Sequence, residues 1–167
     1  GVALWFTWLI AARLVEGDKR ALALTMLMLS PGFNLQPLKF NSNALLIPVW
    51  ASATWLFLRS YSSRTLLAGA LAGVGAAIAM LTKYWSVFLI VGFAVGAFAH
   101  PRWRDYFRSP APWASIAVGA ALLAPNIATL FQYDFYAFTY ASASHADASF
   151  ASVLESLGGY FGGVLYL

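Results

Sequence analysis

The sequence contains no cysteine, and only 10% of its residues are charged. The lack of cysteine excludes disulfide bonds, thiolate nucleophiles and cysteine-ligated metal sites. The scarcity of charge is equally informative, because a soluble domain typically carries about 25% charged residues. With 61% hydrophobic residues and a mean hydropathy of +0.71, the chain is predicted to be an integral membrane protein.

Patterns typical of metal or nucleic-acid binding are also missing. The two histidines, His100 and His145, lie far apart, and no spacing suited to metal ligands is present. The net charge is +4, but the basic residues do not form a patch with interleaved aromatics. Nucleic acid is therefore not an expected partner.

The two ends of the sequence look like internal positions of a longer chain. It begins at Gly1 rather than at methionine, without the charged-then-apolar layout of a signal peptide. It stops within an apolar run at Leu167. We therefore expect residues 1–167 to form a single transmembrane domain that is a fragment of a larger protein.

Seven uncharged runs indicate where helices cross the membrane. About 20 apolar residues are needed to span a hydrocarbon core of roughly 30 Å. Five of the runs approach that length, while the first and last have 12 residues each. The sequence predicts an all-α, polytopic transmembrane helix bundle with about five complete and two partial spans. The runs are 1–12, 21–38, 40–58, 65–82, 84–101, 109–133 and 156–167.

Every second connection between these runs is basic. The connections 13–20, 59–64 and 100–109 hold eight of the ten Lys and Arg residues, and the alternate connections hold only Lys39 and Lys83. By the positive-inside rule, the first set faces the cytoplasm and the second set faces outward. The basic connections read as anchors, with the aspartate at position 105 expected to pair with a neighbouring arginine.

Small residues and tryptophans support this division into helices. Gly69 and Gly73, and then Gly92 and Gly96, repeat a small-xxx-small spacing that allows close helix approach. The alternative is that glycine is simply common in membrane helices. Tryptophans near the predicted helix ends fit an interfacial aromatic belt: Trp50, Trp55, Trp85, Trp103 and Trp113.

Lys83 is the most unusual charge in the sequence. Eighteen uncharged residues separate it from Arg64, and eighteen separate it from Arg102. A charge at the centre of a membrane helix costs roughly 2.5–3.5 kcal/mol on insertion scales. Lys83 therefore marks either a turn at the bilayer surface or a buried site that uses positive charge. The alternation of basic connections favours a turn on the outward face.

Two lysines on the predicted outward face each stand beside an aromatic residue, Lys39 beside Phe40 and Lys83 beside Tyr84. Compact ammonium groups suit phosphate and pyrophosphate, so both lysines are candidates for binding an anionic head group. The alternative is that both are topological anchors whose side chains extend to the membrane interface.

The long connection 132–155 adds acidic residues to the outward face. Asp134, Asp147 and Glu155 could supply a general base, with His145 assisting. A long loop in a compact unit is often functional. A solvated acidic loop, or an amphipathic stretch along the outer surface, explains the same residues.

The stretch ALAGVGAAIAMLTKYWSVFLIVGFAVGAFAHPRWRDYFRSPAPWASIAVGAALLAPNI has a distinctive order of features. A small-residue helix ends in L-T-K-Y, an apolar helix and a basic loop follow, and S-P-x-P-W opens a long helix. With FNSNALLIPVWASATWLFLRS upstream, roughly residues 20–131 resemble the membrane region of the bacterial relatives of protein O-mannosyltransferases. These GT-C-type, polyprenyl-phosphate-sugar glycosyltransferases include lipid A aminoarabinose transferases and enzymes that add sugars to lipopolysaccharide core.

The resemblance implies a membrane glycosyltransferase of the cell envelope. It would move a sugar from a polyprenyl-phosphate donor to a glycan, lipid or protein acceptor on the periplasmic side of a bacterial inner membrane. Lys83, at the family's Lys-Tyr position, would bind the donor phosphate, and Tyr84 would help orient it. Lys39 lies in a suitable loop but matches no motif. The acceptor side would be shaped by the loop that contains Asp134, His145 and Asp147.

The resemblance also places the catalytic acid outside this sequence. The acidic motif of the first outward loop should precede residue 1, so the chain alone is expected to be inactive. Many relatives carry Asp where this sequence has Asn43. No cofactor is identified, and the family leaves a divalent metal open because it includes enzymes with and without one. The rival interpretations are a transporter or flippase for a lipid-linked or anionic substrate, and a membrane scaffold.

Overall fold

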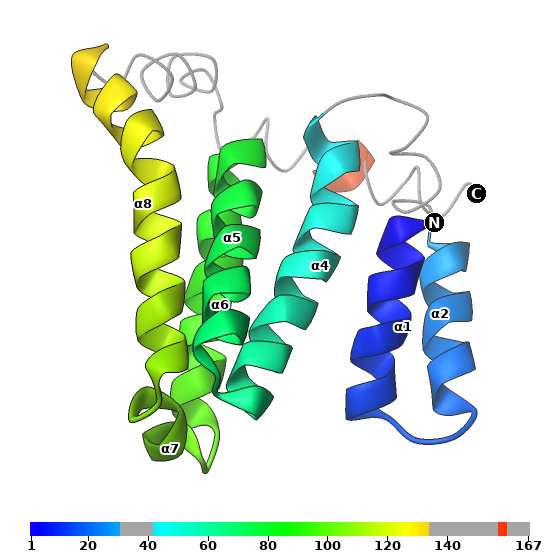
Figure 1. Ribbon diagram of the computed structural model, residues 1–167. Helices are drawn as coiled ribbons and strands as arrows, with labels where there is room; N and C mark the ends of the chain where they lie inside the picture. Colours follow the sequence, from blue (N-terminus) through cyan, green and yellow to red (C-terminus); the bar gives the residue numbers. More distant parts are fainter. Residues whose placement is uncertain (31–41, 134–156, 160–167) are drawn as a thin grey trace. The chain divides into compact units, whose positions relative to one another are not determined.

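The computed structural model describes residues 1–30, 42–133 and 157–159 (Figure 1). Within these ranges every regular element is a helix and no strand is present, which confirms the predicted all-α class. The elements are α1 (Val2–Leu14), α2 (Lys19–Leu29), α4 (Ser42–Ser63), α5 (Leu66–Thr82), the 3₁₀ helix η2 (Tyr84–Ser86), α6 (Val87–Ala99), α7 (Trp103–Phe107) and α8 (Pro110–Gln132).

The chain divides into two units, Gly1–Pro125 and Asn126–Leu167. The first unit contains α1 to α7 and most of α8. Within it, α4 packs against both α1 and α5, and it also contacts α6. The turn that carries Lys83 belongs to this first unit.

The described helices follow the uncharged runs of the sequence. α4 ends where Arg64 adopts a φ of 56°, a left-handed conformation that reverses the chain after a helix. α5 begins after Thr65, whose hydroxyl oxygen accepts a hydrogen bond from the backbone N–H of Ala68 at 3.3 Å, as N-cap residues do. The start of the next run is therefore read correctly from the sequence, whereas α4 continues through most of the predicted connection 59–64 and ends only at Ser63.

Glycines of α5 allow this helix to approach α8 closely. A Cβ atom at Gly69 would collide with the backbone carbonyl of Ala111, and one at Gly73 would collide with a carbonyl one turn further along α8. The first small-xxx-small pair therefore mediates helix packing, as predicted. Gly92 and Gly96 in α6 meet no described atom within 4 Å of an added Cβ. Gly92 and Gly96 fit the alternative explanation, that glycine is simply common in membrane helices.

An aromatic cluster joins α4, α6 and α7 at one end of the unit. Tyr61 and Tyr106 are buried with ring centroids 4.5 Å apart, and the Tyr61 hydroxyl donates to the Ala97 carbonyl at 3.3 Å. Phe57 stacks on Phe93 with centroids 4.5 Å apart. Aromatic pairs at these separations add to the stability that burial alone provides.

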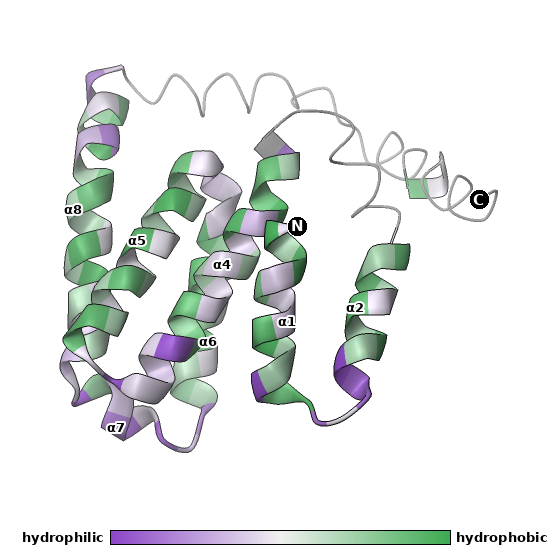
Figure 2. Cartoon of the chain, turned by 45° about the vertical axis from the view of Figure 1, so that its right-hand side comes forward, coloured by the Kyte–Doolittle hydropathy of each residue, from purple (hydrophilic) through white to green (hydrophobic). Residues whose placement is uncertain are grey.

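Hydrophobic residues make up most of the helices (Figure 2). Many large apolar side chains on these helices are exposed, whereas small residues lie in the contacts between helices. Buried side chains are mostly alanines, with two serines and two tyrosines. By contrast, Trp5, Leu67 and Phe88 are 63%, 70% and 63% exposed. An apolar exterior with small residues at helix interfaces is typical of helices that contact lipid.

One described helix, α8, is both long and apolar enough to cross a membrane, with 23 residues and a mean hydropathy of 1.7 over its most apolar stretch of 18 residues. α1, α5 and the stretch Tyr84–Ala99 are apolar but shorter. The 17 residues of α5 correspond to about 25 Å of helix. The predicted polytopic bundle of five complete and two partial spans is therefore supported only in part.

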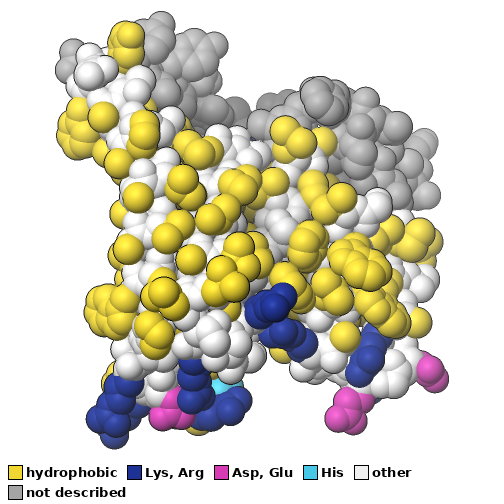
Figure 3. Space-filling model, viewed as in Figure 1, with side chains coloured by type: hydrophobic (Ala, Val, Ile, Leu, Met, Phe, Trp, Pro, Cys, Tyr) yellow, Lys and Arg dark blue, Asp and Glu magenta, His cyan; other side chains and the backbone are white. Residues whose placement is uncertain are grey.

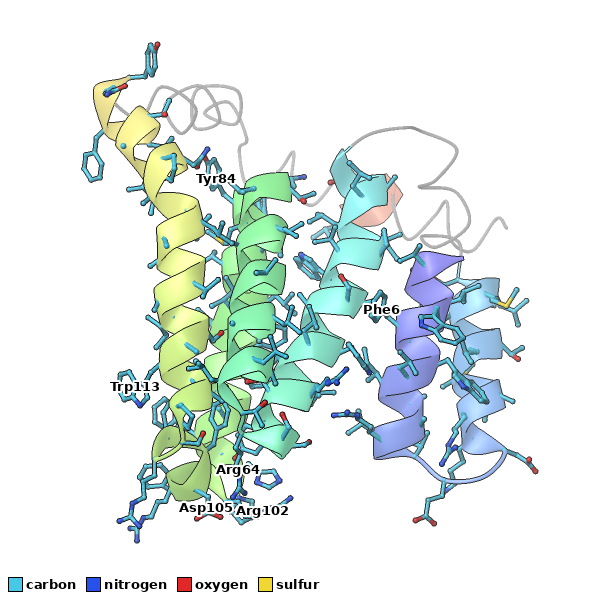
Figure 4. All side chains as sticks on the ribbon, viewed as in Figure 1. Phe6, Arg64, Tyr84, Arg102, Asp105 and Trp113 are labelled. Carbon is cyan, nitrogen blue, oxygen red and sulfur yellow. The ribbon has the colours of Figure 1, made fainter. Side chains whose placement is uncertain are left out.

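Basic side chains gather at one end of the first unit (Figure 3). The three connections predicted to be basic lie at this end, whereas Tyr84, next to Lys83, lies at the opposite end (Figure 4). Asp105 forms an ion pair with Arg64 at 3.3 Å. The expected pairing with a sequence neighbour is therefore replaced by a link between the α4–α5 turn and α7.

Candidate functional site: the turn between α5 and α6

The turn 83–86 places Lys83 between two apolar helices. Lys83 has an extended backbone with a φ of −163° and a ψ of 132°, and η2 then leads into α6. The backbone N–H of Lys83 donates to the Ala79 carbonyl at 3.2 Å and so completes the last turn of α5. The lysine therefore occupies a turn, as the pattern of basic connections predicted.

A buried hydrogen-bond chain fixes this turn against α4. Ser86 is fully buried, and its hydroxyl donates to the Ala79 carbonyl at 2.7 Å. The same hydroxyl accepts a hydrogen bond from Nε1 of Trp50 at 2.8 Å. The sequence suggested Trp50 for the interfacial belt, but its indole N–H is used inside the unit. The chain thus links α4, the end of α5 and η2.

The Lys83 side chain donates a hydrogen bond from Nζ to Oδ1 of Asn43 at 2.7 Å. Asn43 lies in the first turn of α4, so this contact joins residues 40 positions apart in the sequence. An amide oxygen orients the ammonium group without cancelling its charge. An aspartate at this position would form an ion pair instead.

Lys83 has no acidic partner among the described residues. Within the described residues, an ion pair joins Arg64 to Asp105. Figure 4 shows both of these residues at the end of the unit opposite to Tyr84. The position of Lys83 at the C-terminus of α5 offsets part of its charge, because a helix dipole favours a cation there. Within the described part of the chain, the ammonium group of Lys83 is therefore not neutralised by an acid, and an ammonium group is a chemical match for an anionic group such as a phosphate.

The structure describes only some of the other predicted site residues. Tyr84 opens η2 beside Lys83, and its side chain is partly exposed. Among the residues that the structure describes, no cluster of three His, Cys, Asp or Glu side chains could hold a metal ion. Five predicted site residues lie outside the described ranges: Lys39, Asp134, His145, Asp147 and Glu155.

Sequence reasoning did not identify Ser86 or Trp50 as parts of the site. The two residues are 36 positions apart, and their contact depends on how α4 packs against the turn. One weak signal is available, because Ser86 places a hydroxyl group three residues after Lys83 between long apolar runs. Such a hydroxyl needs a partner once it is buried.

Comparison with known protein families gives a match over most of the chain. The family model for dolichyl-phosphate-mannose-protein mannosyltransferase matches residues 1–128, which include the whole of the Lys83 turn and its partners in α4. No curated protein and no solved structure matches the chain.

Proposed function

The chain belongs to the dolichyl-phosphate-mannose-protein mannosyltransferase family of membrane glycosyltransferases, and from this premise we propose that it transfers a sugar from a polyprenyl-phosphate donor. The acceptor is a hydroxyl group of a glycan, lipid or protein. The site of transfer is the membrane side that the Lys83 turn faces, the periplasmic side of a bacterial inner membrane.

The hydrogen bond between Lys83 and Asn43 carries this proposal. It holds an ammonium group in place with a neutral partner, and no described acid neutralises the charge. A topological anchor needs only to reach the interface, and an orienting amide adds nothing to that role. A group that must meet a phosphate gains from being held in position before the ligand arrives.

The chemistry of the reaction explains why a fixed cation is useful. When the bond between the sugar and the donor phosphate breaks, negative charge develops on the departing polyprenyl phosphate. A positive charge already aimed at this position lowers the barrier. Lys83 supplies the charge and Tyr84 helps orient the phosphate, with Lys39 as a further phosphate ligand. Acceptor-side contacts come from the loop with Asp134, His145 and Asp147.

The distribution of charge supports a multi-pass arrangement with this orientation. Basic side chains gather at one end of the first unit, and the Lys83 turn lies at the other (Figures 3 and 4). The positive-inside rule assigns the strongly basic end to the cytoplasm. The Lys83 turn then faces outward, where the donor sugar is used.

The proposal is tested by sugar transfer from polyprenyl-phosphate donors in the purified full-length protein. Lys83→Met removes the charge but keeps most of the side-chain volume, and it should lower kcat/KM by about 100-fold, as does the loss of one stabilising group at a developing anion. Asn43→Leu keeps the lysine but removes the amide oxygen that orients its ammonium group, so it should also weaken donor use. Lys19→Met removes an exposed charge at the other end of the unit and should leave kcat/KM within about twofold, because an exposed lysine far from the donor adds little to its binding.

Two outcomes would contradict the proposal. Undiminished sugar transfer by the Lys83→Met protein would show that Lys83 does not bind the donor phosphate. If the wild-type protein transfers no sugar from any polyprenyl-phosphate donor, but moves a lipid-linked or anionic substrate across vesicle membranes, it is a transporter or flippase.

A further inference from the structure

A second electropositive site lies between α1 and α4, away from the Lys83 turn. Arg13 in the last turn of α1 and Arg59 in α4 place their guanidinium carbons 6.0 Å and 5.3 Å from the ring centroid of Trp55. Phe6 of α1 packs on the same indole with centroids 5.6 Å apart (Figure 4). Two cations from different helices therefore converge on one aromatic side chain.

No described acid compensates these two arginines. Glu16 and Asp18 follow α1 closely in the sequence but form no ion pair in the described residues, and Asp105 pairs with Arg64. Both arginines of the site are exposed. The indole face of Trp55 attracts them only weakly at an exposed position, and it neutralises neither charge. Both charges therefore remain available to an external anion.

We propose that Arg13 and Arg59 bind the phosphodiester group of an anionic phospholipid. Guanidinium groups present paired N–H donors that match phosphate oxygens, and they are more weakly hydrated than ammonium groups. Basic pockets between membrane helices on the cytoplasmic side bind anionic lipid head groups in this way. α4 contributes to both sites, but Arg59 lies near its C-terminal end, close to the basic end of the unit, whereas Asn43 lies in its first turn. The lipid site is therefore separate from the proposed donor site.

The surroundings favour a lipid over a free phosphate ion. Leu14, next to Arg13, is 66% exposed, and Trp5 and Trp8 of the same helix are 63% and 41% exposed. These apolar side chains offer contact to acyl chains beside a pair of cations. Trp55 is an amphipathic ring of the kind that lies at head-group depth. A lipid satisfies both the charge and the apolar surface, whereas a free ion satisfies only the charge.

The test is lipid binding to the purified full-length protein in detergent, counted by native mass spectrometry. The probes are phosphatidylglycerol, zwitterionic phosphatidylcholine and inorganic phosphate. Arg59→Gln and Arg13→Gln should each weaken the tightest phosphatidylglycerol site by about tenfold, the effect of losing a hydrogen bond to a charged group. The double variant should lose less than the product of the two effects, because both groups hold one phosphate.

Arg104→Gln is the matched control. The guanidinium carbon of Arg104, an exposed residue, lies 5.4 Å from the ring centroid of Trp103, and no second guanidinium group of the described residues lies over that ring. This variant removes the same charge and the same kind of ring contact, so it should leave phosphatidylglycerol binding within about twofold of wild type. Arg59→Lys keeps a point charge without the paired donors and should give an intermediate affinity, which separates a binding role from a folding defect.

Three results would overturn the proposal. Equal losses from Arg104→Gln and Arg59→Gln would mean that the surface attracts anionic lipid without a defined site. Equal affinity for phosphatidylcholine and phosphatidylglycerol would mean that the net negative charge of the lipid does not contribute to binding. Competition by inorganic phosphate at concentrations matching the lipid affinity would assign the site to a free anion instead of a head group.

Discussion

Ser86→Ala should destabilise the protein by removing the centre of the hydrogen-bond chain that fixes the Lys83 turn. The Ser86 hydroxyl is fully buried, donates to the Ala79 carbonyl at 2.7 Å and accepts from the Trp50 indole at 2.8 Å. The Ala79 carbonyl keeps its bond from the Lys83 backbone. The main cost is therefore one orphaned indole N–H, which is worth about 1–3 kcal/mol of unfolding free energy.

The measurement is unfolding of the full-length protein in mixed micelles, followed by circular dichroism. Ser62→Ala is the matched control, because that exposed hydroxyl donates to the Leu58 carbonyl within its own helix. This control should change stability by less than about 0.5 kcal/mol. Trp50→Phe removes the donor, so the Ser86→Ala and Trp50→Phe effects should overlap by about 1 kcal/mol in the double variant.

Two results would refute this reasoning. A Ser86→Ala loss no larger than the Ser62→Ala loss would mean that the buried hydroxyl contributes nothing to the turn. Strict additivity of Ser86→Ala and Trp50→Phe would mean that the two side chains do not act together. If the chain also positions Lys83, the Ser86→Ala protein should show a raised KM for the sugar donor.

Two further predictions use other parts of the first unit. Gly73→Leu should cost about 1–3 kcal/mol because its side chain would meet the α8 backbone, whereas Gly96→Leu faces open space and should be tolerated in the same unfolding assay. Burial raises the pKa of Tyr106 above the ordinary value of 10.0, so its contribution to stability is complete below pH 10 and is lost as the pH rises through the raised pKa. Tyr106→Phe should therefore reduce the fall in unfolding free energy at high pH, and Tyr133→Phe, at an exposed position, should not.

Local signals in the sequence predict the elements but not the contacts between them. The end of α5 is predictable because Lys83 interrupts two apolar runs of equal length. The chain reversal at Arg64 is predictable in the same way, because charged residues there separate two uncharged runs. By contrast, the Gly69 and Gly92 positions have the same spacing pattern, and only the first meets a neighbouring backbone. Spacing shows that a helix can be approached closely, and tertiary packing decides whether it is.

The candidate site illustrates the same limit. Lys83 is recognisable because it is an isolated charge between two apolar runs. Lys83 and Tyr84 are also recognisable because they lie in an L-T-K-Y sequence that resembles the family's. Asn43 and Trp50 join them only because α4 packs along α5 and the turn, and residues this distant in the sequence carry no mutual signal. The polar partners of a turn in an apolar protein are thus set by long-range packing.

The contact between Lys83 and Asn43 also limits the direction from which a ligand can arrive. An ammonium group has three N–H bonds in a tetrahedral arrangement, and the amide of Asn43 occupies one of them. The other two N–H bonds diverge from the Asn43 oxygen at tetrahedral angles. In the proposed donor complex, the phosphate would meet these two N–H bonds, while the hydrogen bond to Asn43 keeps the cation from rotating.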